Sequence, residues 1–368
     1  MRGRGGFPEL TKRFSRRWLL GAGSSALAAA LIFPFGTGRT QEIRYFRIGT
    51  GETGGSLFIL GGVIASAVSN PPGSRSCDDG GSCGVPGLIA LAQTTAGSVE
   101  NVTDIASGQL DSGLCQADVA YWAYNGKDVF EHDGAIAKLR ALANLYEESV
   151  HVIVHRDSKI KSVSDLKGAR VNLGPKDSGN LLTARLVLKA FGLSEKKLKA
   201  DYGDLATASG KFSDGSLDAL IVLGEVPMPA IVSLAAKTPL TLLPVSGDKV
   251  AQLRLANDFL SVDIIPADAY AGGGVTSTVG IGILWVVSAD LEEPLAYDLT
   301  KALWNKANRK LLDETGALGR QVKPGAALQA VPLPIHPGAQ RYYSELEMKP
   351  AGADNPDTAT PDTPPATP

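Results

Sequence analysis

The sequence of 368 residues has few of the side chains on which disulfide-built scaffolds, metal sites and many active sites depend. It contains three cysteines and four histidines, and aromatic residues make up 6% of it. Three cysteines are too few for a disulfide scaffold. His151 and His155 can share one face of a strand, but no carboxylate or third histidine stands at a metal-ligand spacing. We therefore expect no metal centre and interpret these two histidines as structural.

The sequence also lacks a hydrophobic run long enough to span a bilayer comfortably, and its body lacks an excess of basic residues. The apolar segment 21–35 is shorter than the roughly 20 residues that a membrane helix needs. The first 38 residues carry a net charge of +5, so the remainder carries −7 because the whole chain carries −2. A chain with a net negative charge does not attract the negatively charged phosphate backbone of nucleic acid. Nucleic acid is therefore not expected as a partner.

Residues 1–38 have the pattern of an export signal. A basic stretch ends in Ser15-Arg16-Arg17-Trp18-Leu19-Leu20 and continues into the alanine-rich apolar segment. Paired arginines before a large apolar residue are typical of the bacterial twin-arginine signal. Small residues at 36–38 allow cleavage there, and an uncleaved anchor helix is the alternative. We predict a periplasmic protein, membrane-anchored if the signal is not cleaved. In an oxidising compartment Cys77 and Cys83, which lie close together in a Gly- and Ser-rich loop, can form a local disulfide.

Segments with the period of a strand alternate with segments with the period of a helix, which predicts parallel sheets covered by helices. The length of the chain allows two domains. The last 20 residues, 349–368, are mostly Pro, Thr, Asp and Ala without apolar periodicity, and we predict a disordered tail. The expected strands are 43–49, 110–116, 139–145, 151–155, 170–173, 217–223, 241–245 and 280–288, and the expected helices include 57–68, 98–105 and 181–191.

Two short motifs resemble catalytic ones without the context that catalysis needs. Residues 49–54 match G-x-G-x-x-G, but the acidic residue that a dinucleotide site has roughly 20 residues later would fall in the cysteine loop. Ser82 is the centre of a G-x-S-x-G match, but no hydrophobic strand precedes it. Cys115 lies in a strand that we expect to be buried, so we interpret it as a packed thiol. We expect no enzyme and no cofactor; a nucleotide site and a hydrolase are the alternatives.

Three polar turns stand where a strand gives way to a helix. In open α/β sheets such turns lie at the carboxyl ends of strands, where ligands bind. The unpaired N–H groups and positive dipole end of a helix N-terminus can hold a carboxylate. The alternative is that each turn only caps its helix. The turns are Thr53-Gly54-Gly55-Ser56, Thr94-Thr95-Ala96-Gly97-Ser98 with Asn101, and Ser178-Gly179-Asn180.

Several segments, in order along the chain, form a recognisable pattern. They are 48–51 with 53–55, 97–101, 116–120, 145–152, 164–168, 178–180, 265–267 and Ile335-His336-Pro337-Gly338-Ala339-Gln340-Arg341-Tyr342-Tyr343. Together they resemble the TAXI family of TRAP-transporter receptors. The resemblance covers nearly the whole chain after the export signal, from about Arg44 to Glu345, and the final His-Pro-Gly-Ala motif is fairly specific.

This resemblance implies an α/β protein with the type II periplasmic-binding-protein fold, in which two lobes joined by a hinge close on a central ligand cleft. One lobe would combine residues 43–148 with 265–348, and the other would be 149–264. Pro227 matches a further turn of the cleft, although Glu225 beside it departs from the family pattern. The cleft residues that the resemblance implies are Thr53, Gly54, Gly55, Ser56, Ser98, Asn101, Gln116 and Ala117 from the first lobe, and Ser178, Gly179, Asn180 and Pro227 from the second.

The resemblance also implies the function. The protein would bind a small carboxylate, such as a glutamate-like amino acid or a dicarboxylate, and pass it to a TRAP-type multi-span membrane permease. A same-fold sensor that presents a small acid to a signalling partner is the alternative. We expect a monomer, and we expect the disulfide loop to stiffen the rim of the cleft. Asp118 and Glu225 are the acidic residues expected on the cleft side.

Overall fold

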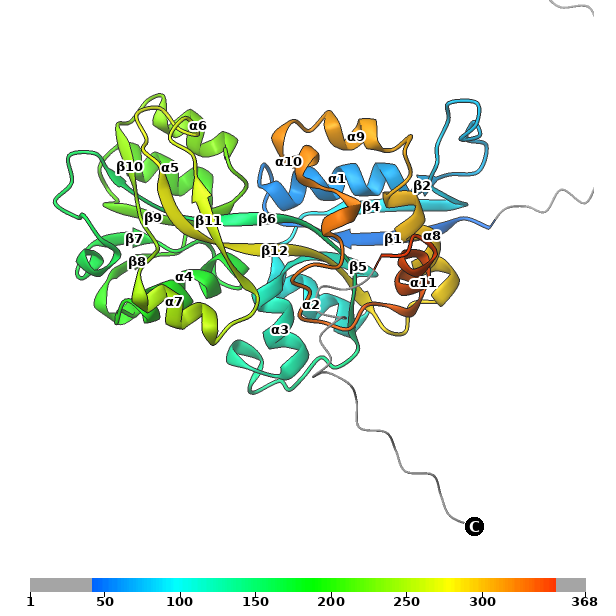
Figure 1. Ribbon diagram of the computed structural model, residues 1–368, viewed down its shortest axis with the longest axis horizontal. Coiled ribbons are helices and arrows are strands. Elements are labelled where there is room, and N and C mark those ends of the chain that lie inside the picture. The colour runs from blue at the N-terminus through cyan, green and yellow to red at the C-terminus, as the bar shows by residue number, and fades with distance from the viewer. Residues whose placement is uncertain (1–41, 349–368) are drawn as a thin grey trace, which may run out of the picture. The chain divides into compact units, whose positions relative to one another are not determined.

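The computed structural model describes residues 42–348. The predicted export signal and the predicted tail lie outside the described residues. Among the described residues, the strands form one 10-stranded mixed sheet and a separate two-stranded one. Helices pack on both faces of the large sheet, and helices and strands gather into two α/β lobes (Figure 1). No helix of this part of the chain is long and apolar enough to cross a membrane.

The first lobe is built around parallel strands in the order β4-β1-β5. Apolar residues of β1 and α1, among them Phe46, Ile48 and Leu60, pack with the C-terminal helices in one buried cluster. The elements of this lobe are β1 (Arg44–Gly49), β4 (Leu88–Gln93), β5 (Ser112–Gln116), α1 (Ser56–Val68), α2 (Ser98–Ser107), α3 (Ala117–Asn125), α8 (Glu293–Leu303), α9 (Arg309–Asp313), α10 (Ala317–Gln321) and α11 (Pro337–Glu345).

The second lobe repeats this plan with parallel strands in the order β9-β7-β8. Its apolar residues divide between two buried clusters, one of which also contains residues of α2 and α3 from the first lobe. The core is therefore continuous beneath the space between the lobes. The elements are β7 (Arg170–Asn172), β8 (Lys199–Asp201), β9 (Ala219–Gly224), β10 (Leu240–Leu243), α4 (Gly179–Ala190), α5 (Leu205–Ser213), α6 (Pro229–Ala235) and α7 (Asp248–Leu255).

Two long antiparallel strands, β6 (Leu139–His155) and β12 (Thr276–Ser288), run from one lobe into the other. The sequence predicted two strands in place of β6, which was wrong. Both halves are apolar, and residues 146–149 between them still pair with β12. The expectation of parallel sheets was also wrong, because each strand that crosses between the lobes is antiparallel to its neighbours.

The return from the second lobe to the first lies within β12. Strand β11 (Leu260–Ile265) pairs antiparallel with residues 276–281 of β12, whereas residues 283–287 pair with β5 of the first lobe. Tyr270, in the loop between β11 and β12, belongs to a buried cluster of the second lobe. We therefore propose that the lobes divide near Glu148 in β6 and near Gly282 in β12, rather than at residue 265.

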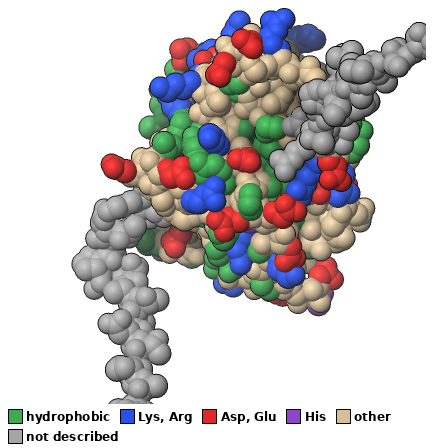
Figure 2. Space-filling model, turned by 90° about the vertical axis from the view of Figure 1, so that its right-hand side faces the viewer, with side chains coloured by type: hydrophobic (Ala, Val, Ile, Leu, Met, Phe, Trp, Pro, Cys, Tyr) green, Lys and Arg blue, Asp and Glu red, His purple; other side chains and the backbone are tan. Residues whose placement is uncertain are grey.

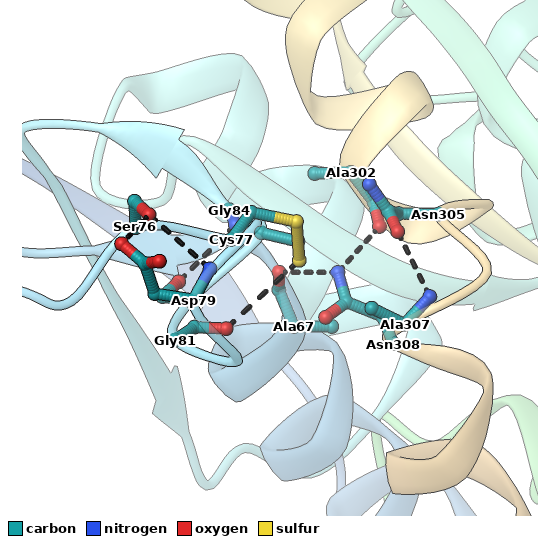
Figure 3. The surroundings of a disulfide bond; sticks show 12 residues. Ala67, Ser76, Cys77, Asp79, Gly81, Gly84, Ala302, Asn305, Ala307 and Asn308 are labelled. Carbon is teal, nitrogen blue, oxygen red and sulfur yellow. Dashed lines mark hydrogen bonds between the residues drawn. A yellow bond between two sulfur atoms is a disulfide. The ribbon is translucent and has the colours of Figure 1, made fainter.

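The disulfide loop lies at the end of α1 that is remote from the space between the lobes. Cys77 and Cys83 are bonded, which confirms the predicted pair (Figure 3). The loop joins the short strands β2 (Ser69–Asn70) and β3 (Val85–Pro86), and β2 begins where α1 ends. Beside it, the Nδ2 atom of Asn308 donates hydrogen bonds to the carbonyl oxygens of Ala67 and Ala302. Because the loop lies away from the space between the lobes, the expectation that it stiffens the cleft rim was wrong.

The surface of the described residues carries both signs of charge. On the face shown in Figure 2, Lys and Arg side chains are interspersed with Asp and Glu side chains. Exposed ion pairs such as Lys138 with Asp290 join side chains of this kind, and exposed pairs contribute about 0–1 kcal/mol each to stability.

Candidate functional site

A cavity of ≈ 120 Å³ lies between the two lobes, and both contribute to its lining. Most of its first-lobe residues stand at or after the carboxyl ends of β1, β4 and β5, and most of its second-lobe residues at or after those of β7 and β9; Glu148 lies within β6 and Leu205 follows β8. Two larger hollows, of ≈ 850 and ≈ 620 Å³, open elsewhere. Neither contains any of the three polar turns. The cavity between the lobes is therefore the candidate site.

Three helices of the first lobe begin at this cavity. Gly55 and Ser56 stand at the start of α1, Gly97 and Ser98 at the start of α2, and Gln116 caps α3. All five of these residues line the cavity. The Oγ atom of Ser98 accepts a hydrogen bond of 3.0 Å from the backbone N–H of Gln116, which holds the starts of α2 and α3 together. The positive ends of these helix dipoles therefore meet at one place.

A fourth helix, α4, begins at the cavity from the second lobe. Ser178, Gly179 and Asn180 line it. Ser178 is the N-cap: its Oγ accepts a hydrogen bond of 3.2 Å from the N–H of Leu181 and donates one of 2.7 Å to the carbonyl of Pro175. Both hydrogen bonds of this hydroxyl are therefore made with backbone groups of its own turn. A Cβ atom on Gly179 would lie 1.7 Å from Oε1 of Gln116, so the lobes touch across the cavity at this glycine.

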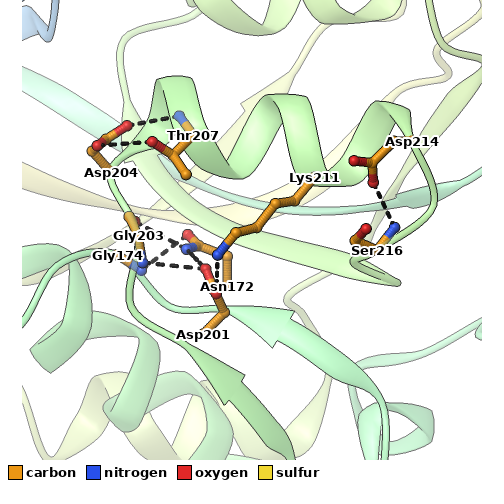
Figure 4. A network of polar contacts seen from close by, with 9 residues as sticks. All are labelled: Asn172, Gly174, Asp201, Gly203, Asp204, Thr207, Lys211, Asp214 and Ser216. Carbon is orange, nitrogen blue, oxygen red and sulfur yellow. Dashed lines mark hydrogen bonds and ion pairs between the residues drawn. The ribbon is translucent and has the colours of Figure 1, made fainter.

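A polar network stands behind the second-lobe wall (Figure 4). Asn172, which lines the cavity, donates hydrogen bonds to the Oδ2 atom of Asp201 at 2.8 Å and to the carbonyl of Gly203 at 2.9 Å. The other carboxylate oxygen of Asp201 pairs with Lys211. This basic side chain is therefore held by an acidic partner and is not free to bind a ligand.

Asn101 and Asn180 make equivalent side-chain hydrogen bonds in the two lobes. The Nδ2 atom of Asn101 donates 2.8 Å hydrogen bonds to the carbonyl of Thr50, directly after β1, and to that of Leu114, within the adjacent strand β5. The Nδ2 atom of Asn180 donates likewise to Leu173 and Ile221, at 2.8 and 2.9 Å. Each asparagine therefore links the first half of its helix to the backbone in or directly after two adjacent strands.

Five of the residues predicted for the cleft do not line the cavity: Thr53, Gly54, Asn101, Ala117 and Pro227. Thr53 and Gly54 are exposed at the turn before α1, and Ala117 is fully buried in the first turn of α3. Pro227 follows a cis peptide bond and precedes Met228, which does line the cavity. Contact of these five residues with a ligand stays a prediction.

Two buried acids stand at the site, and the sequence indicated only one of them as a cleft residue. Glu148 lines the cavity, and its Oε1 atom accepts a hydrogen bond of 2.6 Å from the hydroxyl of Tyr146. Glu225 accepts a hydrogen bond from the hydroxyl of Ser56, across the two lobes. Both acids are 3% exposed. The alternation of side chains along β6 puts Glu148 on one face and Glu147 on the other, a signal that the sequence contained.

Burial raises the pKa values of these acids. The pKa of Glu148 rises to about 7, mainly because burial disfavours the charged form, and Glu225 adds to the rise by charge repulsion. Burial likewise raises the pKa of Glu225, although its hydrogen bond from Ser56 opposes the change. Glu52, which also lines the cavity, has a pKa raised by the same cause. The lining contains no Lys, Arg or His among residues 42–348.

Ser82 and His151, which the sequence offered as catalytic or metal-binding candidates, make hydrogen bonds within the fold. Both hydrogen bonds of the Ser82 hydroxyl go to backbone groups, the carbonyl of Ser69 and the N–H of Gly84. His151 is buried between the carbonyl of Ser149 and the hydroxyl of Tyr270, and burial lowers its pKa to about 4. Within the described part of the chain, no group of His, Cys, Asp and Glu side chains is arranged to hold a metal ion.

A family model described as the NMT1-like family matches residues 48–346. The chain belongs to the NMT1-like family. The match spans both lobes and every residue that lines the cavity. The cavity of this NMT1-like protein is therefore part of the region that the family shares.

Solved structures resemble this NMT1-like protein at low sequence identity. The periplasmic binding protein BugD matches with 12% identity and a TM-score of 0.51, over 82% of this chain and 95% of that one. The aliphatic sulphonate binding protein SsuA from Escherichia coli matches with 16% identity and a TM-score of 0.45, over 82% and 83%. A putative L-cystine ABC transporter from Listeria monocytogenes has 12% identity and a TM-score of 0.45, over 76% and 99%. The likeness to BugD confirms the predicted periplasmic-binding-protein fold.

Proposed function

We propose that this protein is an exported solute-binding receptor that closes its lobes around a small carboxylate and delivers it to a membrane permease. The main support is the convergence of four helix N-termini on one cavity between two lobes. Backbone N–H groups and dipole ends can hold a carboxylate there without an arginine.

Closure supplies the mechanism of the receptor. A ligand in the cavity touches the starts of α1, α2 and α3 from one lobe and of α4 from the other. It gains its full binding free energy only when the lobes are together, so it shifts the population from open to closed. Residues of β6 and β12 near Glu148 and Gly282 serve as the hinge, because these strands join the lobes.

We further propose that the permease is of the TRAP type and that the receptor belongs to the TAXI group. The sequence segments that resemble this group, including the His-Pro-Gly motif at the start of α11, support this assignment. A TRAP permease is driven by an ion gradient. Uptake of the ligand by cells that depend on this receptor should therefore stop when an ionophore collapses the gradient. Uptake that survives the ionophore and stops on depletion of ATP would contradict the TRAP assignment.

Ligand binding is tested on the purified full chain by a thermal-shift screen of small carboxylates. Binding to the native state raises the unfolding midpoint. Mass spectrometry of the denatured protein identifies any compound carried through purification. If no carboxylate raises the midpoint and no small molecule is released, the receptor function is wrong.

A further inference from the structure

The cleft holds two buried acids without a basic partner. Glu148 and Glu225 are both 3% exposed, and neither forms a salt bridge among residues 42–348. Their hydrogen bonds come from neutral hydroxyl groups, those of Tyr146 and Ser56. An ionised carboxylate that is buried without a cation costs free energy. Among the described residues, no positively charged group therefore neutralises the two acids in this part of the cleft.

An independent observation at the same place is the side chain of Gln116. This residue is 4% exposed and lines the cavity, yet its Oε1 atom has no hydrogen-bond partner among the described residues. Its amide also contacts Glu148, whose pKa the contact lowers slightly against the larger effect of burial. Buried acceptors are rarely left without a donor. The wall near Gln116 and Glu148 therefore lacks a hydrogen-bond donor as well as a positive charge.

We propose that the ligand carries a cationic group, such as an ammonium, which donates to Glu148 and to Oε1 of Gln116 and is attracted by the nearby Glu225. This inference rests on the proposed function. The ligand's carboxylate faces the helix N-termini, and its cationic end faces the acids. The preferred ligand is then a small amino acid with no net negative charge. Dicarboxylates and acidic amino acids are disfavoured because their second carboxylate meets like charge.

The size of the cavity agrees with a small ligand. It measures ≈ 120 Å³, far below the roughly 300–1,000 Å³ of pockets for drug-sized molecules. Glu225 forms no part of the lining itself. It acts beside the cavity, through its charge and through the hydroxyl of Ser56, which does line it. Its role is therefore that of a specificity-determining residue.

The test uses sets of acids that differ only at one end. β-Alanine, 3-hydroxypropionate and succinate carry an ammonium, a hydroxyl and a carboxylate on the same chain, and 4-aminobutyrate and glutarate form a longer pair. Isothermal titration calorimetry is run on the full chain after removal of co-purified ligand under denaturing conditions and refolding. We expect the amino member of at least one set to bind about tenfold or more tightly than its dicarboxylate.

Three variants locate the effect. Glu148→Gln and Glu225→Gln keep the shape of the side chain and remove the negative charge, so each should reduce the preference for the amino member. Glu131→Gln is the control for removal of an acid, because Glu131 is exposed, lies outside the hinge strands and does not line the cavity. Circular dichroism checks that each variant is folded. Glu225→Ser is a second change at the same position if Glu225→Gln fails this check.

The outcomes separate this inference from the proposed function. If a dicarboxylate or hydroxy acid binds as tightly as its amino counterpart, the cationic end is wrong while the receptor survives. If none of the probes binds, the molecule that co-purifies with the protein is identified by mass spectrometry. A molecule without an amino or guanidino nitrogen overturns the inference, and a molecule that contains such a group supports it. If no molecule binds or is released, both the receptor function and this inference fail.

Discussion

The carboxylate of Asp118, in the first turn of α3, accepts a hydrogen bond of 2.7 Å from the hydroxyl of Thr183 in α4. The two helices belong to different lobes, so this bond exists only when the lobes are together. Asp118 is fully buried, and burial raises its pKa to about 6, while the bond from Thr183 opposes the rise. Asp118 is thus a contact between the lobes, and it does not line the cavity.

Replacement of Thr183 by valine should weaken ligand binding. The variant removes the donor and leaves a buried carboxylate oxygen unpaired, which costs about 1–3 kcal/mol. Because this cost falls on the closed form, ligand affinity should fall by about tenfold. Calorimetry with the tightest-binding acid measures it. Thr103→Val is the control, since the Thr103 hydroxyl bonds only within its own helix. Equal affinity of Thr183→Val and wild type would show that the bond is absent from the ligand-bound form.

Gly179→Ala should prevent full closure. The added Cβ would lie 1.7 Å from Oε1 of Gln116 and 3.0 Å from Oγ of Ser98, both in the other lobe. We expect at least a tenfold loss of affinity with little change in the unfolding midpoint. Gly210→Ala is the control, because that glycine lies in α5 with nothing within 4 Å of the added atom. A Gly179→Ala variant that binds like wild type would contradict the closed arrangement of these two turns.

Asn101→Ala should destabilise the protein rather than only weaken binding. The asparagine is fully buried, and its side chain makes hydrogen bonds with Thr50, Leu114 and Thr95. Its loss leaves buried carbonyl groups without donors, at about 2–4 kcal/mol. Thermal unfolding without ligand measures the change. An unchanged midpoint together with lost binding would instead support direct contact of Asn101 with the ligand.

Stability of the ligand-free protein should fall as pH rises through the pKa of Glu148. The folded-state pKa, about 7, is raised above the value of 4.5 for a free side chain. The folded form therefore binds the proton more tightly than the unfolded form, and this contribution is complete below pH 4.5 and lost above about pH 7. Glu147, with a pKa of about 7, acts in the same direction, and the lowered pKa of His151 acts in the opposite direction below pH 6.5.

The difference between wild type and Glu148→Gln isolates this residue. Unfolding midpoints are measured at pH 5 and pH 8 for both proteins. We expect the variant to gain stability relative to wild type as pH rises, because it no longer buries a charge at pH 8. A difference that does not change with pH would show that Glu148 is not buried in the ligand-free protein.

Reduction of the Cys77–Cys83 disulfide should lower stability without changing ligand affinity. The bond closes a short loop, for which we expect about 2 kcal/mol or less of stabilisation. The loop follows the end of α1 opposite to Ser56 and Leu57, the residues of α1 that line the cavity. Midpoints and affinities with and without reductant provide the measurement, and the double variant with serine at both positions should reproduce them. Loss of binding on reduction would place the loop in the binding mechanism.

The sequence by itself determined the features that depend on neighbours along the chain. Apolar periods predicted most strands of the large sheet and the helices α1, α2 and α4, and Gly- and Ser-rich turns predicted where these three helices begin. Two cysteines in one short loop predicted the disulfide. Each of these depends on residues within a few positions of one another, so local propensity and spacing carry the information.

Only the tertiary structure decided which residues meet across the lobes. Ser56 and Glu225 are 169 residues apart in the chain, and Asp118 and Thr183 are 65 apart. The period of β6 separates Glu147 from Glu148 but does not say which of them faces the cleft. The sequence likewise could not tell that Asn101 and Asn180 bond to backbone carbonyl groups of β5 and β9. Such contacts depend on how two sheets and their helices pack, and no short segment of the chain contains that information.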